Sequence, residues 1–64
     1  MKIKEAIDMI LKREHMKRAN ELGHALNVDP TYVYRWRKGV EPLLPNVLKL
    51  IDKYPYVKKL LLER

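Results

Sequence analysis

The chain has no cysteine, no serine and no phenylalanine, and it has only two glycines. Without cysteine, the protein can form neither a disulfide nor a thiolate metal site. The missing serine excludes a serine nucleophile, and two isolated glycines make no glycine-rich phosphate loop. The core must therefore be built from aliphatic side chains and the single tryptophan, Trp36.

The residues that could carry catalysis or bind a metal are also sparse. His15 and His24 are the only histidines, and neither is paired with a second histidine or a carboxylate at ligand spacing. The carboxylates of Glu14, Glu21 and Asp29 form no catalytic set. We therefore expect no metal, no cofactor, no small-molecule ligand and no enzymatic activity.

Long hydrophobic runs are absent as well. No stretch approaches the roughly 20 apolar residues that a membrane-spanning helix needs. The first residues lead straight into an amphipathic segment, so no signal peptide is predicted. These patterns favour a cytoplasmic protein without membrane contact.

What the chain does have is positive charge. Fourteen lysines and arginines stand against eight aspartates and glutamates, which gives a net charge of +6 over 64 residues. This length allows one small domain, 1–64, and the charge suits a polyanionic partner such as a nucleic acid. The alternative is that the charge only keeps a small protein soluble.

Hydrophobic periodicity predicts an all-α fold, a compact bundle of about five short helices. The first helix, for example, repeats Ile3, Ile7 and Ile10 at helical spacing. Residues 40–64 leave a pair of strands open as an alternative, although their leucine spacing favours helices. The predicted helices span 3–13, 16–26, 30–38, 45–53 and 56–63.

Residues 17–39 contain the strongest local signals. Gly23 within a helix predicts a close approach by the next helix, where a methyl group would crowd. Asn27 tolerates the left-handed conformation that ends a helix. Asp29 and Pro30 are typical of an N-cap and a first turn, and Gly39 is typical of a helix end. The pattern is that of two short helices joined by a tight turn, a helix-turn-helix.

This segment resembles the helix-turn-helix of the lambda-repressor-like fold, above all the small phage Cro repressors. The family's apolar, small or flexible, and basic positions are matched by Leu22, Gly23, Leu26, Asn27, Val28, Val33, Trp36, Lys38 and Gly39. The chain departs from the family at Gly23, where alanine is usual, and at Asn27, where glycine is usual. The resemblance implies a sequence-specific repressor of a phage or prokaryotic host cell that covers a palindromic operator in double-stranded DNA.

Helical geometry assigns roles to the third helix. If Val33 and Trp36 point inward, the opposite side of the helix faces outward. An outward arginine such as Arg35 can bond O6 and N7 of one guanine together. The predicted base contacts are Thr31, Tyr34, Arg35 and Lys38. The predicted backbone contacts are Lys17, Arg18, Asn20, Tyr32 and Arg37, with Asn20 placed by its resemblance to a phosphate-contact position.

Other interpretations of these residues stay open at this point. Arg35 and Arg37 are also compatible with ordinary solvated charges, and Tyr34 with a packed side chain. Trp36 fits a core position better than a base-stacking platform. Tyr32 fits both a half-buried position and a contact with the DNA backbone.

The C-terminal segment predicts self-association. It carries more apolar side chains than one short helix is expected to bury, and two-fold dimers place half-sites about 34 Å apart on DNA. We therefore expect a homodimer, weak in solution and assembled on DNA. The alternative is that the same side chains only close the core. The predicted interface residues are Tyr54, Tyr56, Val57 and Leu61.

Two further hypotheses compete with a sequence-specific regulator. One is an antitoxin-like protein-interaction module that retains a helix-turn-helix core. The other is a nonspecific architectural or RNA-binding protein, which would show steep salt dependence and little sequence preference.

Overall fold

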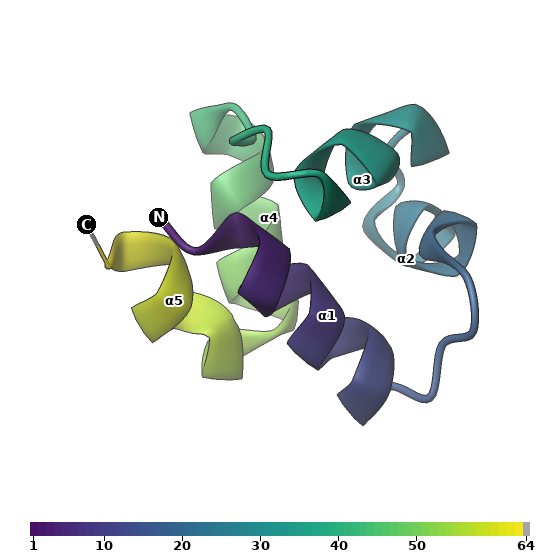
Figure 1. Cartoon of the computed structure of the whole chain (residues 1–64), viewed down its shortest axis with the longest axis horizontal. Helices are drawn as coiled ribbons and strands as arrows, with labels where there is room; N and C mark the ends of the chain where they lie inside the picture. The colour runs from purple at the N-terminus through teal and green to yellow at the C-terminus, as the bar shows by residue number, and fades with distance from the viewer. Residues whose placement is uncertain (64) are drawn as a thin grey trace.

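The computed structural model describes residues 1–63, and these residues form helices and no strand. The all-α prediction is therefore confirmed, and the alternative strand pair in residues 40–63 is excluded. The elements are α1 (Ile3–Arg13), α2 (Ala19–Leu26), α3 (Pro30–Arg37), α4 (Leu44–Lys53), the 3₁₀ turn η1 (Pro55–Val57) and α5 (Lys58–Leu62) (Figure 1).

Helix α1 lies across the middle of the molecule (Figure 1). It packs against α3 on one side and against η1 and α5 on the other, while α2 and α3 pack on each other. The apolar stripe predicted for α1 is buried in full. The largest side chains with less than 2% exposure come from every α-helix of the bundle and from η1: Ile7, Ile10, Leu22, Val33, Leu50, Val57 and Leu61.

Three helices end in the same way, with one residue in the left-handed region. These residues are His15 at the end of α1, Asn27 at the end of α2 and Gly39 after α3, with φ of 55°, 57° and 101°. In each case the next backbone N–H bonds a carbonyl five residues back, as in a Schellman motif. The three bonds are Met16 N to Leu11 O (2.8 Å), Val28 N to Gly23 O (2.9 Å) and Val40 N to Arg35 O (3.0 Å). The ends predicted at Asn27 and Gly39 are confirmed.

The second helix begins at Ala19, so the predicted start at residue 16 is wrong. The cause is the side chain of Glu21, whose Oε2 accepts the backbone N–H groups of Lys17 (2.6 Å) and Arg18 (2.9 Å). These bonds hold the chain in a turn, and Arg18 is extended at the N-cap. In a full capping box, the N-cap side chain also accepts the backbone N–H of the third helical residue. An arginine side chain has no acceptor, so only the half of the box that Glu21 makes is present.

The remaining boundaries differ by smaller amounts. Helix α3 ends at Arg37 with Lys38 as its C-cap, and α4 begins at Leu44, one residue before the predicted start. The predicted helix 56–63 is divided into η1 and α5. Pro55 opens η1, since a proline fits a first turn, and the predicted break at Tyr54–Pro55 is confirmed.

One long side chain connects α4 to the helix-turn-helix. The Nζ of Lys53 donates to the carbonyl oxygen of Ala25, 2.9 Å away, in the last turn of α2. A cation at this position satisfies a carbonyl that lacks an intrahelical partner and opposes the negative end of the helix dipole. Within residues 1–63, no helix combines the length and hydropathy that a membrane span requires.

Candidate nucleic-acid interface

Helix α2 approaches α3 at Gly23, which has no side chain. A Cβ atom at this position would lie 3.1 Å from the Cα of Pro30 and 3.1 Å from the carbonyl oxygen of Val28. Both are backbone atoms, which cannot swing aside as the end of a flexible side chain can. The predicted close approach is confirmed: a methyl group here would require these neighbours to shift by a few tenths of an ångström.

The start of α3 is held by Asp29. Its Oδ1 accepts the backbone N–H of Thr31 at 2.9 Å, which makes it the N-cap, and Pro30 occupies the first turn as predicted. Hydrogen bonds from Thr31 lower the pKa of Asp29 below its usual value, so the cap is charged at neutral pH. The orientation of α3 is thus fixed at both ends, by this cap and by Gly39.

The two sides of α3 differ as the helical spacing predicts. Val33 is fully buried and Trp36 is 2% exposed, so Trp36 is a core residue and cannot serve as a base-stacking platform. The opposite side faces solvent. All four residues predicted to contact bases are exposed there: Thr31, Tyr34, Arg35 and Lys38.

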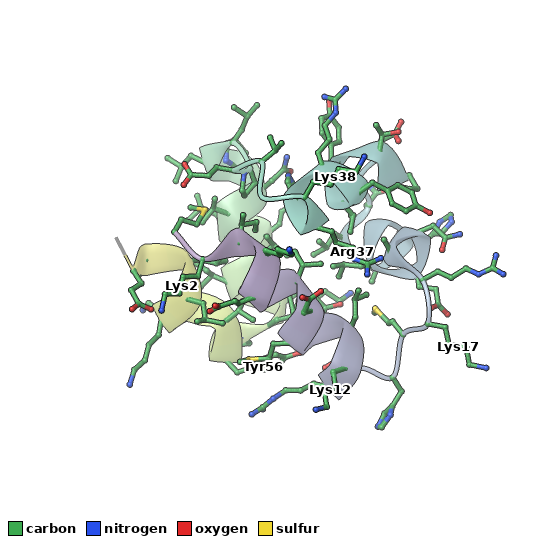
Figure 2. All side chains as sticks on the ribbon, in the orientation of Figure 1. Lys2, Lys12, Lys17, Arg37, Lys38 and Tyr56 are labelled. Carbon is green, nitrogen blue, oxygen red and sulfur yellow. The ribbon has the colours of Figure 1, made fainter. Side chains whose placement is uncertain are left out.

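Tyr34 is 48% exposed, so its ring is not packed in the core. Tyr32 is 45% exposed and lines a hollow together with Trp36. One edge of the Tyr32 side chain therefore faces solvent, and the other packs against the protein. Arg37 and Lys38 leave the end of α3 in different directions (Figure 2), since Arg37 follows Val33 by one helical turn and Lys38 follows Tyr34. Arg37 is exposed but lies outside the group formed by the four outward residues.

The predicted backbone contacts at the start of α2 come from a rigid turn. Lys17 and Arg18 have exposed side chains, while their backbone N–H groups are bound by Glu21. These two hydrogen bonds lower the pKa of Glu21, so its carboxylate keeps the turn closed at neutral pH. This role of Glu21 was not predicted from the sequence, although a glutamate three residues after an N-cap is the spacing that signals it.

Asn20 is partly buried in the first turn of α2. Its Oδ1 is shielded from solvent and has no hydrogen-bond partner within the described part of the chain. Figure 2 shows Lys17 at the turn before α2, well apart from Lys38 at the end of α3. The structure therefore gathers the four predicted base contacts on one side of α3 and places Lys17 at a separate edge.

The predicted dimer interface is wrong for three of its four residues. Tyr54, Val57 and Leu61 are 3%, 0% and 2% exposed within the single chain, where they pack against the core. A second copy cannot reach them without opening the fold. The alternative, that these side chains close the core, describes them correctly.

The fourth residue, Tyr56, is half-buried and engaged within its own chain (Figure 2). Its hydroxyl donates to Glu14 Oε2 at 2.9 Å, and the guanidinium of Arg13 lies 4.6 Å from the ring centroid. Burial, followed by the hydrogen bond to Glu14, raises the pKa of Tyr56 to about 12. Tyr56 joins η1 to the end of α1, a contact between residues far apart in sequence that local patterns do not reveal.

Among residues 1–63, no three histidine or acidic side chains lie close enough together to hold a metal ion. No family model, curated protein or solved structure matches this chain. The site is therefore defined by its own geometry: an exposed, partly basic side of α3, fixed on α2 by a tight turn.

Proposed function

We propose that this protein is a transcriptional regulator that binds specific sequences of double-stranded DNA by inserting α3 into the major groove. The observation that carries the proposal is the division of α3 into two sides. Val33 and Trp36 anchor one side in the core, and the other side presents two residues with hydrogen-bonding and aromatic groups, Tyr34 and Arg35, to solvent. A rigid helix with such an exposed side is the element that reads base edges in helix-turn-helix proteins.

The chemistry of the outward side supports readout of sequence. The guanidinium of Arg35 can donate to O6 and N7 of one guanine, a bidentate contact that discriminates between bases. Thr31 and Tyr34 can contact a thymine methyl group or a base edge. Lys38 adds a cation at the end of the helix.

The start of α2 supplies a second kind of contact. Lys17 and Arg18 are exposed cations on a turn that Glu21 holds, and Asn20 follows them. Contacts of this kind with phosphates position a protein on the duplex without reading its sequence. The net charge of +6 adds a general attraction to DNA that weakens with salt.

By its resemblance to the Cro repressors, the protein acts as a repressor. A weak homodimer covers a palindromic operator and keeps polymerase from the promoter, in the cytoplasm and without a cofactor. The resemblance alone supplies the occlusion step and the repressor role.

Three variants that each remove one positive charge test the assignment. Arg35→Ala is expected to cost about 1–3 kcal/mol on the preferred sequence and to relax the preference at one base pair per half-site. Lys17→Ala is expected to weaken preferred and random duplexes alike. Lys12→Ala changes an exposed cation on α1, well apart from α3 in Figure 2, and controls for the loss of charge alone.

Binding of each variant to both duplexes is measured by fluorescence anisotropy at fixed salt. If Arg35→Ala loses the same free energy on preferred and random DNA, its role in base readout is refuted. If the wild-type protein makes no distinction between the two duplexes, the protein is a nonspecific nucleic-acid binder.

A further inference from the structure

Two carboxylates lie near Arg35, the residue proposed to read guanine. Asp29 caps the start of α3; hydrogen bonds from Thr31 lower its pKa most, and the positive charge of Arg35 lowers it further. Glu41 follows the end of α3 and lines one hollow of about 200 Å³ together with Arg35. A negative charge therefore lies on either side of Arg35 along α3.

The end of α3 fixes the position of Glu41. Gly39 is in the left-handed region, and the backbone N–H of Val40 donates to the carbonyl oxygen of Arg35, 3.0 Å away. The chain thus folds back against the last turn of α3, and Glu41 comes next. Glu41 is exposed, and it is the only charged residue in the segment 39–48. Its charge is therefore not cancelled by a neighbour along the chain.

Neither carboxylate binds Arg35 directly. Within residues 1–63, the only ion pair joins Lys2 Nζ to Glu63 Oε1, which are 3.2 Å apart. The guanidinium of Arg35 can therefore turn toward a duplex. Glu41 acts through space, both on this guanidinium and on any group of the DNA that approaches it.

A carboxylate beside Arg35 affects two kinds of DNA contact differently. A phosphate carries a full negative charge, so Glu41 repels it as it approaches the guanidinium. The guanine acceptors O6 and N7 belong to a neutral base, and Glu41 repels them much less. A repulsive element that weakens the wrong contact more than the right one increases specificity.

We propose that Glu41 is a specificity-determining residue, which opposes contacts between Arg35 and DNA phosphates and so lowers the affinity for duplexes that lack the preferred sequence. The inference rests on the proposed function, because it requires a sequence that Arg35 reads. Glu41 itself contacts no base and acts through Arg35.

Three variants test this role. Glu41→Gln removes the charge and keeps the size of the side chain, and Glu41→Asp keeps the charge. Asp52→Asn is the matched control, since Asp52 is an exposed carboxylate at the end of α4 that is remote from the connection to α3. Binding of each chain to the preferred duplex and to a random duplex is measured by fluorescence anisotropy over a series of salt concentrations.

Glu41→Gln is expected to bind the random duplex about twofold to fivefold more tightly, the size of an interaction between exposed charges. The gain on the preferred duplex is expected to be smaller, so the ratio of the two affinities falls. Binding of Glu41→Gln to the random duplex should also depend more steeply on salt, by a slope of about 1, because Arg35 then contacts one more phosphate. Glu41→Asp should keep the wild-type ratio, and Asp52→Asn should change both affinities equally.

A double-mutant cycle checks that Glu41 acts through Arg35. In a chain that already carries Arg35→Ala, Glu41→Gln is expected to change binding to the random duplex no more than Asp52→Asn does. The salt slope of the double variant should equal that of Arg35→Ala alone.

The proposal is overturned if Glu41→Gln strengthens binding to both duplexes equally, or if its effect persists without Arg35. It is also overturned if Glu41→Gln weakens binding to the preferred duplex, which would make Glu41 a direct contact to a base. These results differ from failure of the proposed function, in which the wild-type chain binds both duplexes equally. That result would overturn the role of Glu41 as well, because no preference would exist for it to increase.

Discussion

Two apolar segments of the chain, residues 40–48 and residues 54–61, differ in how far their side chains are buried. In the second segment, Tyr54, Val57 and Leu61 are at most 3% exposed, because α1 and α4 pack against η1 and α5. In the first segment, four side chains are 54% to 73% exposed. The comparison teaches that the number of apolar residues in a segment does not tell whether they fill the core or face outward. That depends on which helices reach the segment in three dimensions.

The largest expected effect is a change in the free energy of unfolding that distinguishes two adjacent leucines of α5. Leu61 is 2% exposed and Leu62 is 61% exposed. Leu61→Ala should lower the free energy of unfolding by about 2–5 kcal/mol, because it leaves a cavity in the core. A domain of this length has roughly 0.05–0.15 kcal/mol of stability per residue, so this loss removes a large share of its total stability.

Urea unfolding followed by circular dichroism measures this effect, and Leu62→Ala is the matched control. An exposed leucine away from special backbone features should change the free energy of unfolding by no more than about 0.5 kcal/mol. Equal losses in the two variants would contradict the burial pattern on which the comparison of the two segments rests.

A smaller effect is expected at Tyr56, which lies at the edge of the buried segment. Tyr56→Phe removes the hydrogen bond to Glu14 and should lower the free energy of unfolding by about 1 kcal/mol at neutral pH. The folded state raises the pKa of Tyr56 from 10.0 to about 12. Its protonated form therefore contributes stability below pH 10, and this contribution is lost as the pH rises from 10 through 12.

Urea titrations of both chains from pH 8 to pH 12 check the sign of this dependence. Tyr56→Phe should lose less stability than the wild-type chain over the interval above pH 10. Part of the loss should persist in the variant, because burial also raises the pKa of Tyr54. An identical pH dependence in the two chains would contradict the assigned role of Tyr56.

The sequence predicted those parts of the fold that depend on neighbouring residues. The inward stripe of α1, the cap at Asp29 and the helix end at Asn27 all rest on local geometry, and all are observed. Gly23 belongs to this class, because its contact with Pro30 spans one tight turn. The exposed side of α3 followed from the same helical spacing once its inward residues were known.

The parts that sequence could not predict depend on distant contacts or on unusual local choices. His15 ends α1 in the left-handed region, where glycine or asparagine is more common. Glu21 shortens α2 by binding two backbone N–H groups before it. The burial of Tyr54 and Leu61, and the exposure of Leu44 and Leu48, depend on how α1, α4 and α5 meet.

The central claim is that α3 reads DNA sequence, and selection of binding sites from random duplex DNA at physiological salt tests it most directly. We predict that the recovered duplexes share a palindrome whose half-sites lie about 10 base pairs apart, centre to centre. Recovery of duplexes without any consensus would contradict the claim. The positive charge of the protein would then serve binding to nucleic acids irrespective of sequence, and the exposed side of α3 would need another partner.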